Sequence, residues 1–243
     1  LDETLELFEQ HRGASYSVAW LDCLARGKAL GRSHVILGEH AQDGGFILPQ
    51  KQKWTIPCDA PSFLLNRFSL KVFNELYYRR ITQHQHTQIV NIESFFYPLD
   101  SIQNWNRLYG KNGFVQYQFV VPIECGREAL TKIITKISDF GEGSVLCVLK
   151  ALGKKNSNYL SFPIEGYTLA LDFKTSRSTL ELLDELDKLV IQYGGRIYLT
   201  KDSRLQSQNM QKMYPDLTEF LNVRQRYCDT NSVSSYQSSR LGL

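Results

Sequence analysis

Residues 113–199 carry an ordered succession of apolar periods, and this succession most constrains the fold. Val115 and Tyr117 begin an alternating apolar pattern that is typical of a strand, whereas Leu130, Ile133 and Ile137 are spaced as on one face of a helix. Continued along the chain, the patterns predict strands at 115–121, 145–150, 167–173 and 196–199, with helices at about 130–137 and 183–193. This β-α-β-β-α-β order is the ferredoxin-like, or split βαβ, arrangement. We therefore expect an α+β fold with a mainly antiparallel sheet and helices on one face.

The N-terminal region is expected to add further strands to this core. Alternation in 15–22 and an apolar run in 32–38 predict a hairpin, with Trp20 in the core. The turn-rich segment 39–61 is expected to form a long loop. Elsewhere the patterns predict helices at 3–10, 62–80, 204–213 and 216–227, a strand at 89–97 and an irregular serine-rich tail from 229.

Composition excludes several classes of function. Of the 243 residues 42% are hydrophobic, which argues against wholesale disorder, and the net charge of +3 is too small to indicate a nucleic-acid partner. The five cysteines form no Cys-x-x-Cys pair, and His84 and His86 lack evident further ligands, so we expect no metal site. Cys147 is expected to be a buried, inert thiol. Scattered cysteines and the lack of a visible signal peptide favour a reducing, cytoplasmic location.

One face of the predicted sheet is unusually rich in uncharged polar residues. Strand alternation places Gln116 and Gln118 on the face opposite the helices. The same face is expected to carry Lys150 from the second strand and Thr168, Ala170 and Asp172 from the third. Because the first and third strands are adjacent in this arrangement, the glutamines should lie beside Thr168 and Asp172. This face is either a solvated side, as is common for antiparallel sheets, or a surface that hydrogen-bonds hydroxyl groups.

The segment Gly194-Gly195-Arg196 marks the beginning of the last predicted strand. The glycine pair ends a long helical pattern, and Tyr198 and Lys201 stand at the far end of the short apolar strand that follows. A lysine held at a strand end can direct one positive charge at a site. The position of Lys201 alone favours an ordinary lysine in the first turn of a helix.

Several blocks of this sequence resemble one enzyme family. They include Gly194-Gly195-Arg196 with Lys201-Asp202-Ser203-Arg204, and residues 16–22, 27–32, 95–100, 105–110, 113–119, 160–164, 213–215 and 240–241. In order and spacing these blocks are similar to the flavin-linked sugar oxidases of the vanillyl-alcohol-oxidase superfamily, nearest to the family of the flavin subunit of decaprenylphosphoryl-ribose 2′-epimerase. The resemblance covers nearly the whole chain.

This resemblance implies a role for each candidate residue. Residues 1–243 are expected to form a substrate, or cap, domain, with a tail at 228–243 that returns to an N-terminal flavin domain of the same polypeptide. That domain would bind most of the FAD, while Tyr198 and Lys201 would contact the flavin and Lys201 would act in catalysis by stabilising negative charge on it. The residues implied to bind the substrate are Gln116, Gln118, Lys150, Phe96, Tyr97, Thr168, Ala170 and Asp172.

The resemblance also implies a reaction. A secondary alcohol of a sugar, expected to be a polyprenyl-phosphate pentose, would be oxidised by hydride transfer to flavin N5, and a separate short-chain reductase would then reduce the keto product. A lipid substrate would suit contact between an apolar segment near 46–70 and a membrane surface. The sequence departs from the family's usual residues at Phe96, Tyr97, Thr168 and Ala170, which keeps a sugar-lactone oxidase and a non-catalytic ligand-binding module open as alternatives.

Overall fold

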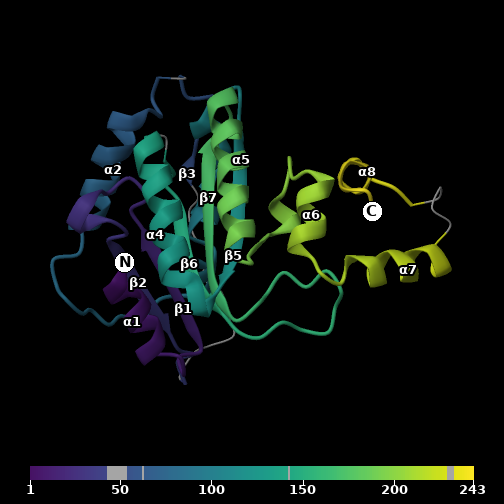
Figure 1. The fold of residues 1–243 in the computed structure, drawn as a ribbon. Helices are drawn as coiled ribbons and strands as arrows, with labels where there is room; N and C mark the ends of the chain where they lie inside the picture. The colour runs from purple at the N-terminus through teal and green to yellow at the C-terminus, as the bar shows by residue number, and fades with distance from the viewer. Residues whose placement is uncertain (43–53, 62, 142, 229–232) are drawn as a thin grey trace.

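A six-stranded sheet forms the centre of the computed structural model, which describes residues 1–42, 54–61, 63–141, 143–228 and 233–243 (Figure 1). The strand order is β2-β1-β6-β7-β5-β8, and all the neighbouring strands pair antiparallel. The strands are β1 (Tyr16–Leu21), β2 (Ser33–Gly38), β5 (Phe114–Pro122), β6 (Cys147–Leu152), β7 (Gly166–Lys174) and β8 (Arg196–Ile197). The predicted α+β class with a mainly antiparallel sheet and extra N-terminal strands is confirmed.

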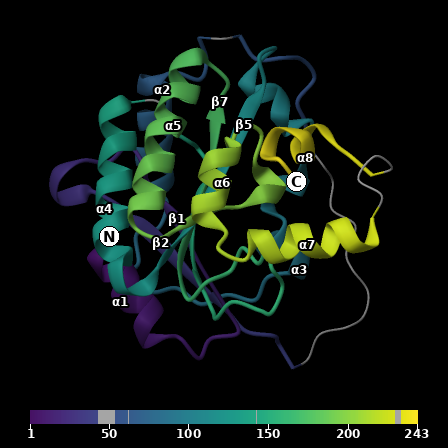
Figure 2. The same ribbon diagram turned by 45° about the vertical axis from the view of Figure 1, so that its right-hand side comes forward.

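One face of the sheet is covered by α4 (Ile123–Phe140) and α5 (Arg177–Gln192), with α1 (Asp2–Gln10) beside them (Figures 1 and 2). The predicted helical stripe of α4 is fully buried there, and Phe119 and Leu171 of the facing strands are buried as well. Cys147 belongs to this core and has a raised thiol pKa because it is buried. The expectation of an inert core cysteine agrees with this burial.

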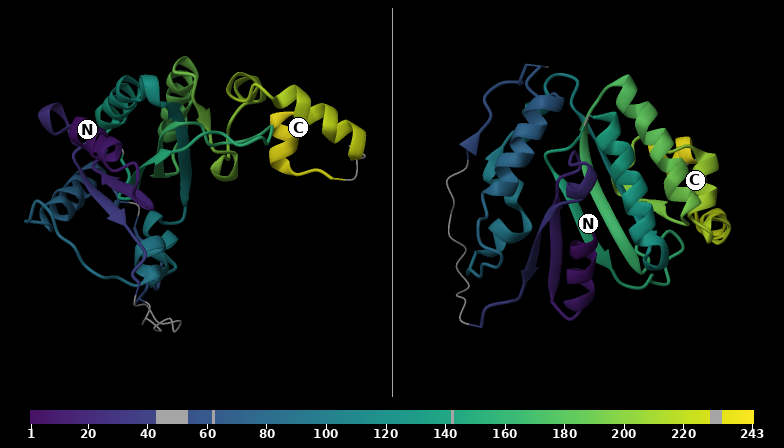
Figure 3. Two further views of the ribbon diagram at one scale, coloured as in Figure 1. Left: turned by 90° about the horizontal axis from the view of Figure 1, so that it is seen from below. Right: turned by 60° about the vertical axis from the view of Figure 1, so that its left-hand side comes forward.

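The opposite face of the sheet carries further helical segments at its edges. Helix α2 (Arg67–Arg79) begins at its cap Asn66 and lies on the side away from α4 and α5 (Figure 3). Its Tyr77 ring packs on Trp20 of β1 with ring centroids 4.5 Å apart, which buries Trp20 as predicted. The short helix η3 (Trp105–Tyr109) packs on Phe114, also on this face. The middle of the face between α2, η3 and β8 is formed by the polar strand residues.

The C-terminal helices α6 (Ser207–Met213), α7 (Leu217–Tyr227) and α8 (Tyr236–Leu241) gather beyond β8 (Figure 2). The Tyr214 hydroxyl donates to the Ile197 carbonyl at 2.6 Å, which fixes this group to the last strand. The sequence predicted an irregular tail, but residues 236–241 form α8, whose cap Ser235 accepts the Ser238 amide. Buried Leu241 and an ion pair from Arg240 to Asp202 at 2.7 Å dock α8 on this chain. Contact of 228–243 with a flavin domain stays a prediction.

Two of the local predictions need correction or qualification. Residues 89–97 do not form a strand; instead α3 (Ile92–Phe96) is a helix whose cap Asn91 accepts the Ser94 amide at 2.8 Å, with Pro98 just beyond its end. The argument that a shifted phenol changes strand face at Tyr97 is therefore wrong. In the predicted loop 39–61, residues 43–53 lie outside the described residues, and β3 (Trp54–Thr55) pairs with β4 (Ile102–Gln103).

Candidate active-site wall

The register of β5, β6 and β7 brings the predicted polar residues onto one surface. Gln116 lies opposite Asp172, Gln118 opposite Ala170, and Lys150 opposite Thr168, so the predicted adjacency is confirmed. Since side chains alternate along each strand, these residues all point away from α4 and α5. We call this surface the polar wall; it consists of Gln116, Gln118, Lys150, Thr168, Ala170 and Asp172.

Hydrogen bonds between β5 and β7 orient the two glutamines of the polar wall. Gln116 donates from Nε2 to Asp172 Oδ1 at 3.0 Å, and Gln118 donates from Nε2 to the Thr168 hydroxyl at 3.1 Å. The Thr168 hydroxyl in turn donates to the Phe119 carbonyl at 2.7 Å. Both glutamines are half-buried. These two hydrogen bonds use the side-chain nitrogens and leave the side-chain oxygens able to accept further hydrogen bonds. The side-chain amides of the polar wall are therefore held in fixed orientations.

Asp172 is the buried carboxylate of the polar wall. Burial raises its pKa above the ordinary value of 3.8, while the Gln116 hydrogen bond and the positive charge of Lys201 lower that pKa. Its Oδ2 atom is buried and lacks a hydrogen-bond partner among the described residues, as does the buried hydroxyl of Tyr109 in η3. Lys150, at the other end of the wall, is exposed.

Tyr198 and Lys201 lie at the edge of the wall because β8 is tied closely to β5. The Tyr198 amide donates to the Gln118 carbonyl at 2.8 Å, and the Lys201 amide donates to the Tyr198 carbonyl at 3.0 Å. Gly195 permits this close approach, since a Cβ at that position would lie 2.4 Å from the Val120 carbonyl oxygen. Within the described ranges, the ammonium of Lys201 has no carboxylate within ion-pair distance, although its charge acts on Asp172. Lys201 is thus an uncommitted cation beside the polar wall.

The other predicted site residues, Phe96 and Tyr97, lie at the end of α3 and just after it, and Phe96 contacts the first residue of β1. Phe96 packs edge-to-face on Tyr16 with centroids 4.8 Å apart, and Tyr97 is 59% exposed. Tyr16 alternates onto the same face as Trp20. Phe96 therefore lies on the same side of the sheet as the polar wall, beyond Lys150. Neither Phe96 nor Tyr97 takes part in the hydrogen bonds described for the wall.

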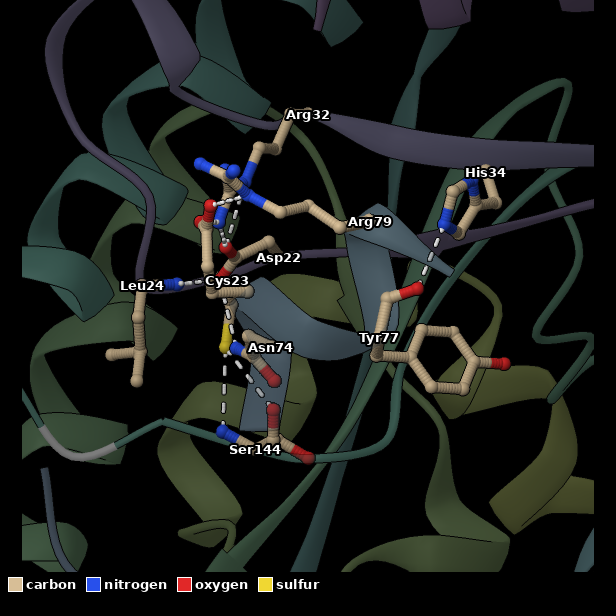
Figure 4. Close-up of polar contacts among 10 residues, drawn as sticks. Asp22, Cys23, Leu24, Arg32, His34, Asn74, Tyr77, Arg79 and Ser144 are labelled. Atoms are coloured by element: carbon tan, nitrogen blue, oxygen red, sulfur yellow. Dashed lines mark hydrogen bonds and ion pairs between the residues drawn. The ribbon is translucent and has the colours of Figure 1, made fainter. Parts of the chain in front are cut away.

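A buried ionic cluster next to the wall has no local sequence signature and was not predicted. Asp22 accepts the Asn74 amide at 2.7 Å through Oδ1 and the Arg32 guanidinium at 2.8 and 3.0 Å through Oδ2 (Figure 4). Arg32 also pairs with Glu75 at 2.6 Å. These contacts fasten α2 to the β1–β2 hairpin and so fix one border of the wall. Asp22 and Arg32 lie in the blocks 16–22 and 27–32 that resemble the enzyme family, and this resemblance was the one feature of the sequence that could have drawn attention to them.

A pocket lies at the opposite border. It is open, has a volume of about 560 Å³, and is lined by residues 156–163 together with Tyr198 and Phe220. The Tyr198 ring packs on Phe162 with centroids 4.5 Å apart, so this aromatic pair forms part of the pocket lining just after β8. In the described part of the chain, no cluster of three or more His, Cys, Asp or Glu residues could hold a metal ion.

The fold and the polar wall define the protein as an α+β domain with oriented amides and a buried carboxylate on one sheet face and a lysine at its edge. Comparison with known proteins makes this class specific: the model of the family "ALO: D-arabinono-1,4-lactone oxidase" matches residues 67–237. The chain belongs to this family of oxidases.

Two relatives extend the comparison beyond the matched range. Over 254 aligned residues the chain is 35% identical to "Decaprenylphosphoryl-beta-D-ribose oxidase" of Mycolicibacterium smegmatis. The alignment covers 100% of the chain and 55% of that protein. It is 28% identical to "Uncharacterized protein in mprA 5'region" of Streptomyces coelicolor, covering 94% of the chain and 66% of that protein. The chain therefore spans about half to two thirds of the length of these relatives.

Proposed function

We propose that this chain is the substrate domain of an FAD-dependent oxidoreductase that oxidises a secondary alcohol of a sugar. The observation that carries the proposal is the polar wall, in which hydrogen-bonded Gln116, Gln118 and Asp172 lie beside the uncommitted Lys201. Membership of an oxidase family that includes sugar-lactone oxidases by name supports the redox class. The polypeptide is proposed to carry an N-terminal domain that holds most of the cofactor.

The residues at the edge of the wall fit a flavin ring. Tyr198 is a half-buried aromatic residue next to Gln118, and Lys201 supplies a cation that is not neutralised by a carboxylate within the described parts of the chain. When bound, FAD would supply a hydride acceptor at N5 of its ring. The Lys201 ammonium would stabilise the negative charge that arises nearby in the transition state. Tyr198 would fix the plane against which the substrate is held.

The polar wall would bind and orient the sugar. Gln116 and Gln118 have side-chain oxygens that can accept hydrogen bonds from hydroxyl groups, because their amide nitrogens are held by Asp172 and Thr168. Lys150 is exposed at the wall end and can donate to a sugar oxygen or an attached phosphate. Ala170, between these groups, leaves room for a ring carbon. Phe96 and Tyr97 would form the far border of the sugar site, on the side away from Tyr198.

The particular substrate is proposed from the relative in M. smegmatis. Its name states a decaprenylphosphoryl-β-D-ribose oxidase, so we propose a polyprenyl-phosphate pentose as the substrate of this protein. The 2-keto product would be consumed by a separate short-chain reductase, which gives net epimerisation. Location in the cytoplasm, with peripheral contact to a membrane that contains the lipid-linked sugar, is part of this proposal.

A sugar-lactone oxidase is the second candidate, because the family model is named for D-arabinono-1,4-lactone. Both reactions oxidise a carbon that bears a hydroxyl group and would use Lys201 in the same way. They differ in the rest of the ligand: an aldonolactone has no phosphate for Lys150 to contact. Substrate choice therefore separates the two candidates more sharply than the redox chemistry does.

Anaerobic flavin bleaching tests the proposal. The full polypeptide containing this chain is loaded with FAD and mixed with a polyprenyl-phosphate pentose or with aldonolactones. The proposal expects bleaching with the lipid-linked pentose and its loss in Lys201→Ala, with FAD content unchanged. Bleaching only with aldonolactones would favour the second candidate. Bleaching by neither sugar class, with FAD bound, would support the non-catalytic ligand-binding module instead.

A further inference from the structure

Asp172 differs from the other polar residues of the wall because its carboxylate is closed off from ligands. The residue is 3% exposed, and its Oδ2 atom is buried. The Oδ1 atom already accepts the Gln116 amide at 3.0 Å. A sugar hydroxyl needs an acceptor that it can reach, so the burial of Asp172 favours a role in which this residue acts through its neighbours.

The burial of this carboxylate does little for the fold. A carboxylate removed from water costs free energy unless an ion pair or several hydrogen bonds compensate for the lost hydration. Asp187, on the helix side of the sheet, pairs with the Arg204 guanidinium at 2.8 Å. Asp172 has a hydrogen bond from a neutral amide, and within the described parts of the chain its Oδ2 atom has no partner. A buried titratable group with so little compensation indicates a functional role.

The backbone brings Lys201 toward Asp172 from the neighbouring strand. The Tyr198 amide donates to the Gln118 carbonyl, and the short helix that ends at Lys201 contacts β5. Because β8 and β5 are antiparallel, the chain beyond Tyr198 runs from the level of Gln118 toward that of Gln116, which lies opposite Asp172. At this separation the positive charge of Lys201 lowers the pKa of Asp172.

The other titratable groups that interact with Asp172 are uncharged at neutral pH. Tyr109, on η3, is buried, and burial together with the negative charge of Asp172 raises the pKa of its hydroxyl. Cys147, on β6, is buried as well, and burial is the main cause of the raised pKa of its thiol. Of the described groups that act on Asp172, Lys201 is therefore the charged one.

We propose that Asp172 is a positioning residue, whose buried negative charge moderates the positive charge that Lys201 presents to the flavin and whose hydrogen bond turns the Gln116 side-chain oxygen toward the sugar. This inference rests on the proposed function, because it requires that Lys201 meets the flavin. A carboxylate held beyond ion-pair distance weakens the field of the lysine without neutralising it. Since nearby charge tunes a flavin, its reduction potential would depend on both residues and not on Lys201 alone.

The reduction potential of the bound flavin tests the effect of this charge. The full polypeptide is loaded with FAD and titrated with dithionite against a reference dye, without sugar. Asp172→Asn should shift the potential upward, because loss of a negative charge favours the electron-rich reduced ring. At a fixed potential the ratio of reduced to oxidised flavin should rise by about threefold or more. Lys201→Ala should shift the potential downward, and Gln116→Ala, which keeps the carboxylate, should shift it less than Asp172→Asn does.

Asp184→Asn is the matched control, because it removes the same charge from a side chain that is 51% exposed on the helix side of the sheet. It should leave the potential at the wild-type value. An Asp172→Asn potential that equals the wild-type value, or that moves downward, would overturn the inference. So would an upward shift of the same size in Asp184→Asn.

Carboxyl NMR of the full polypeptide freed of FAD gives a second measurement that needs neither cofactor nor sugar. The Asp172 signal is identified by its absence in Asp172→Asn. The pKa of this carboxyl should be higher in Lys201→Ala than in the wild type, because the lysine lowers it. An unchanged pKa would overturn the inference even if the enzyme oxidises the sugar. The expected pKa and potential shifts without sugar oxidation would support the inference and contradict the proposed function.

Discussion

The two faces of β5 show how one strand separates stability from chemistry. On one face Tyr117 and Phe119 are buried against the helices, and on the other Gln116 and Gln118 form the polar wall. Each face also holds a buried aspartate whose pKa is raised by burial. Asp187 of α5, on the helix side, receives the Tyr117 hydroxyl at 3.0 Å and the Arg204 guanidinium at 2.8 Å.

Asp172, on the wall, differs from Asp187 in one respect. Its hydrogen bond comes from neutral Gln116, and the positive charge of Lys201 acts on it without an ion pair between the two described residues. The carboxylate in the core is therefore neutralised within the chain, whereas the lysine and carboxylate of the wall are left available. We infer that the core face maintains the fold and that the wall face carries the function. The following predictions test this contrast, beginning with the largest effect.

Asp187→Ala should destabilise the protein by about 2–4 kcal/mol, because the buried Tyr117 hydroxyl and the Arg204 guanidinium lose their buried acceptor and only the half-exposed Asp184 still pairs with Arg204. Urea unfolding followed by circular dichroism measures this loss. Asp184→Ala is the control: Asp184 pairs with the same arginine from a site that is 51% exposed, so it should cost at most about 1 kcal/mol. Equal losses in the two variants would contradict the assignment of a buried structural ion pair.

Lys201→Ala should lower the rate of sugar-dependent flavin reduction by about 100-fold, the usual cost of removing one preorganised charge-stabilising group. Stopped-flow absorbance on the FAD-loaded full polypeptide measures this rate. The unfolding free energy should change by no more than about 0.5 kcal/mol, because Lys201 is not in the core. Exposed Lys154, changed to alanine, serves as the control. A rate that survives in Lys201→Ala would remove this lysine from the mechanism.

Gln118→Ala should raise the KM for the sugar by about 3- to 10-fold, the equivalent of one hydrogen bond. The kcat should fall less than KM rises, since the side chain binds the ligand in both the ground state and the transition state. Steady-state kinetics with an artificial electron acceptor separate the two constants. Val148 also alternates onto this face but is apolar; Val148→Ala should leave KM closer to the wild-type value than Gln118→Ala does.

Asp172→Asn should have a small effect on stability, and the size of this effect depends on pH. Because the pKa of Asp172 is raised in the folded state above 3.8, ionisation of this group destabilises the fold. That penalty is absent below pH 3.8, grows as the pH rises through the folded-state pKa and is fully present above it. The asparagine keeps an acceptor for Gln116, so the variant should gain stability relative to the wild type with rising pH. Unfolding curves across the acidic range measure the difference, and a gain that shrinks as pH rises would contradict it.

Much of the fold and wall could be predicted because their signals are local. Alternation from Val115 onward fixed which side of β5 is apolar, and it therefore placed Gln116 beside Asp172 once the strands were adjacent. The prediction of a strand at 89–97 was wrong because a short apolar run is compatible with both a strand and a helix. The side chain of Asn91 caps the first turn and so favours the helix.

The contacts that could not be predicted join residues distant in sequence. Asp22 and Asn74 are 52 residues apart, and nothing local to either residue indicates that they meet. For the same reason α2 could be predicted as a helix, but its apolar residues could not be divided into buried and exposed. Leu70 faces the sheet, whereas Phe68, Val72 and Leu76 face outward.

The central claim is that the flavin and the sugar meet on the polar wall. A crystal structure of the full polypeptide with FAD bound tests this most directly. The account predicts that the isoalloxazine ring lies against Tyr198, within contact distance of Lys201 Nζ, with Gln116 and Gln118 facing the space above it. A ring bound on the side of α4 and α5, or held far from Lys201, would contradict the account.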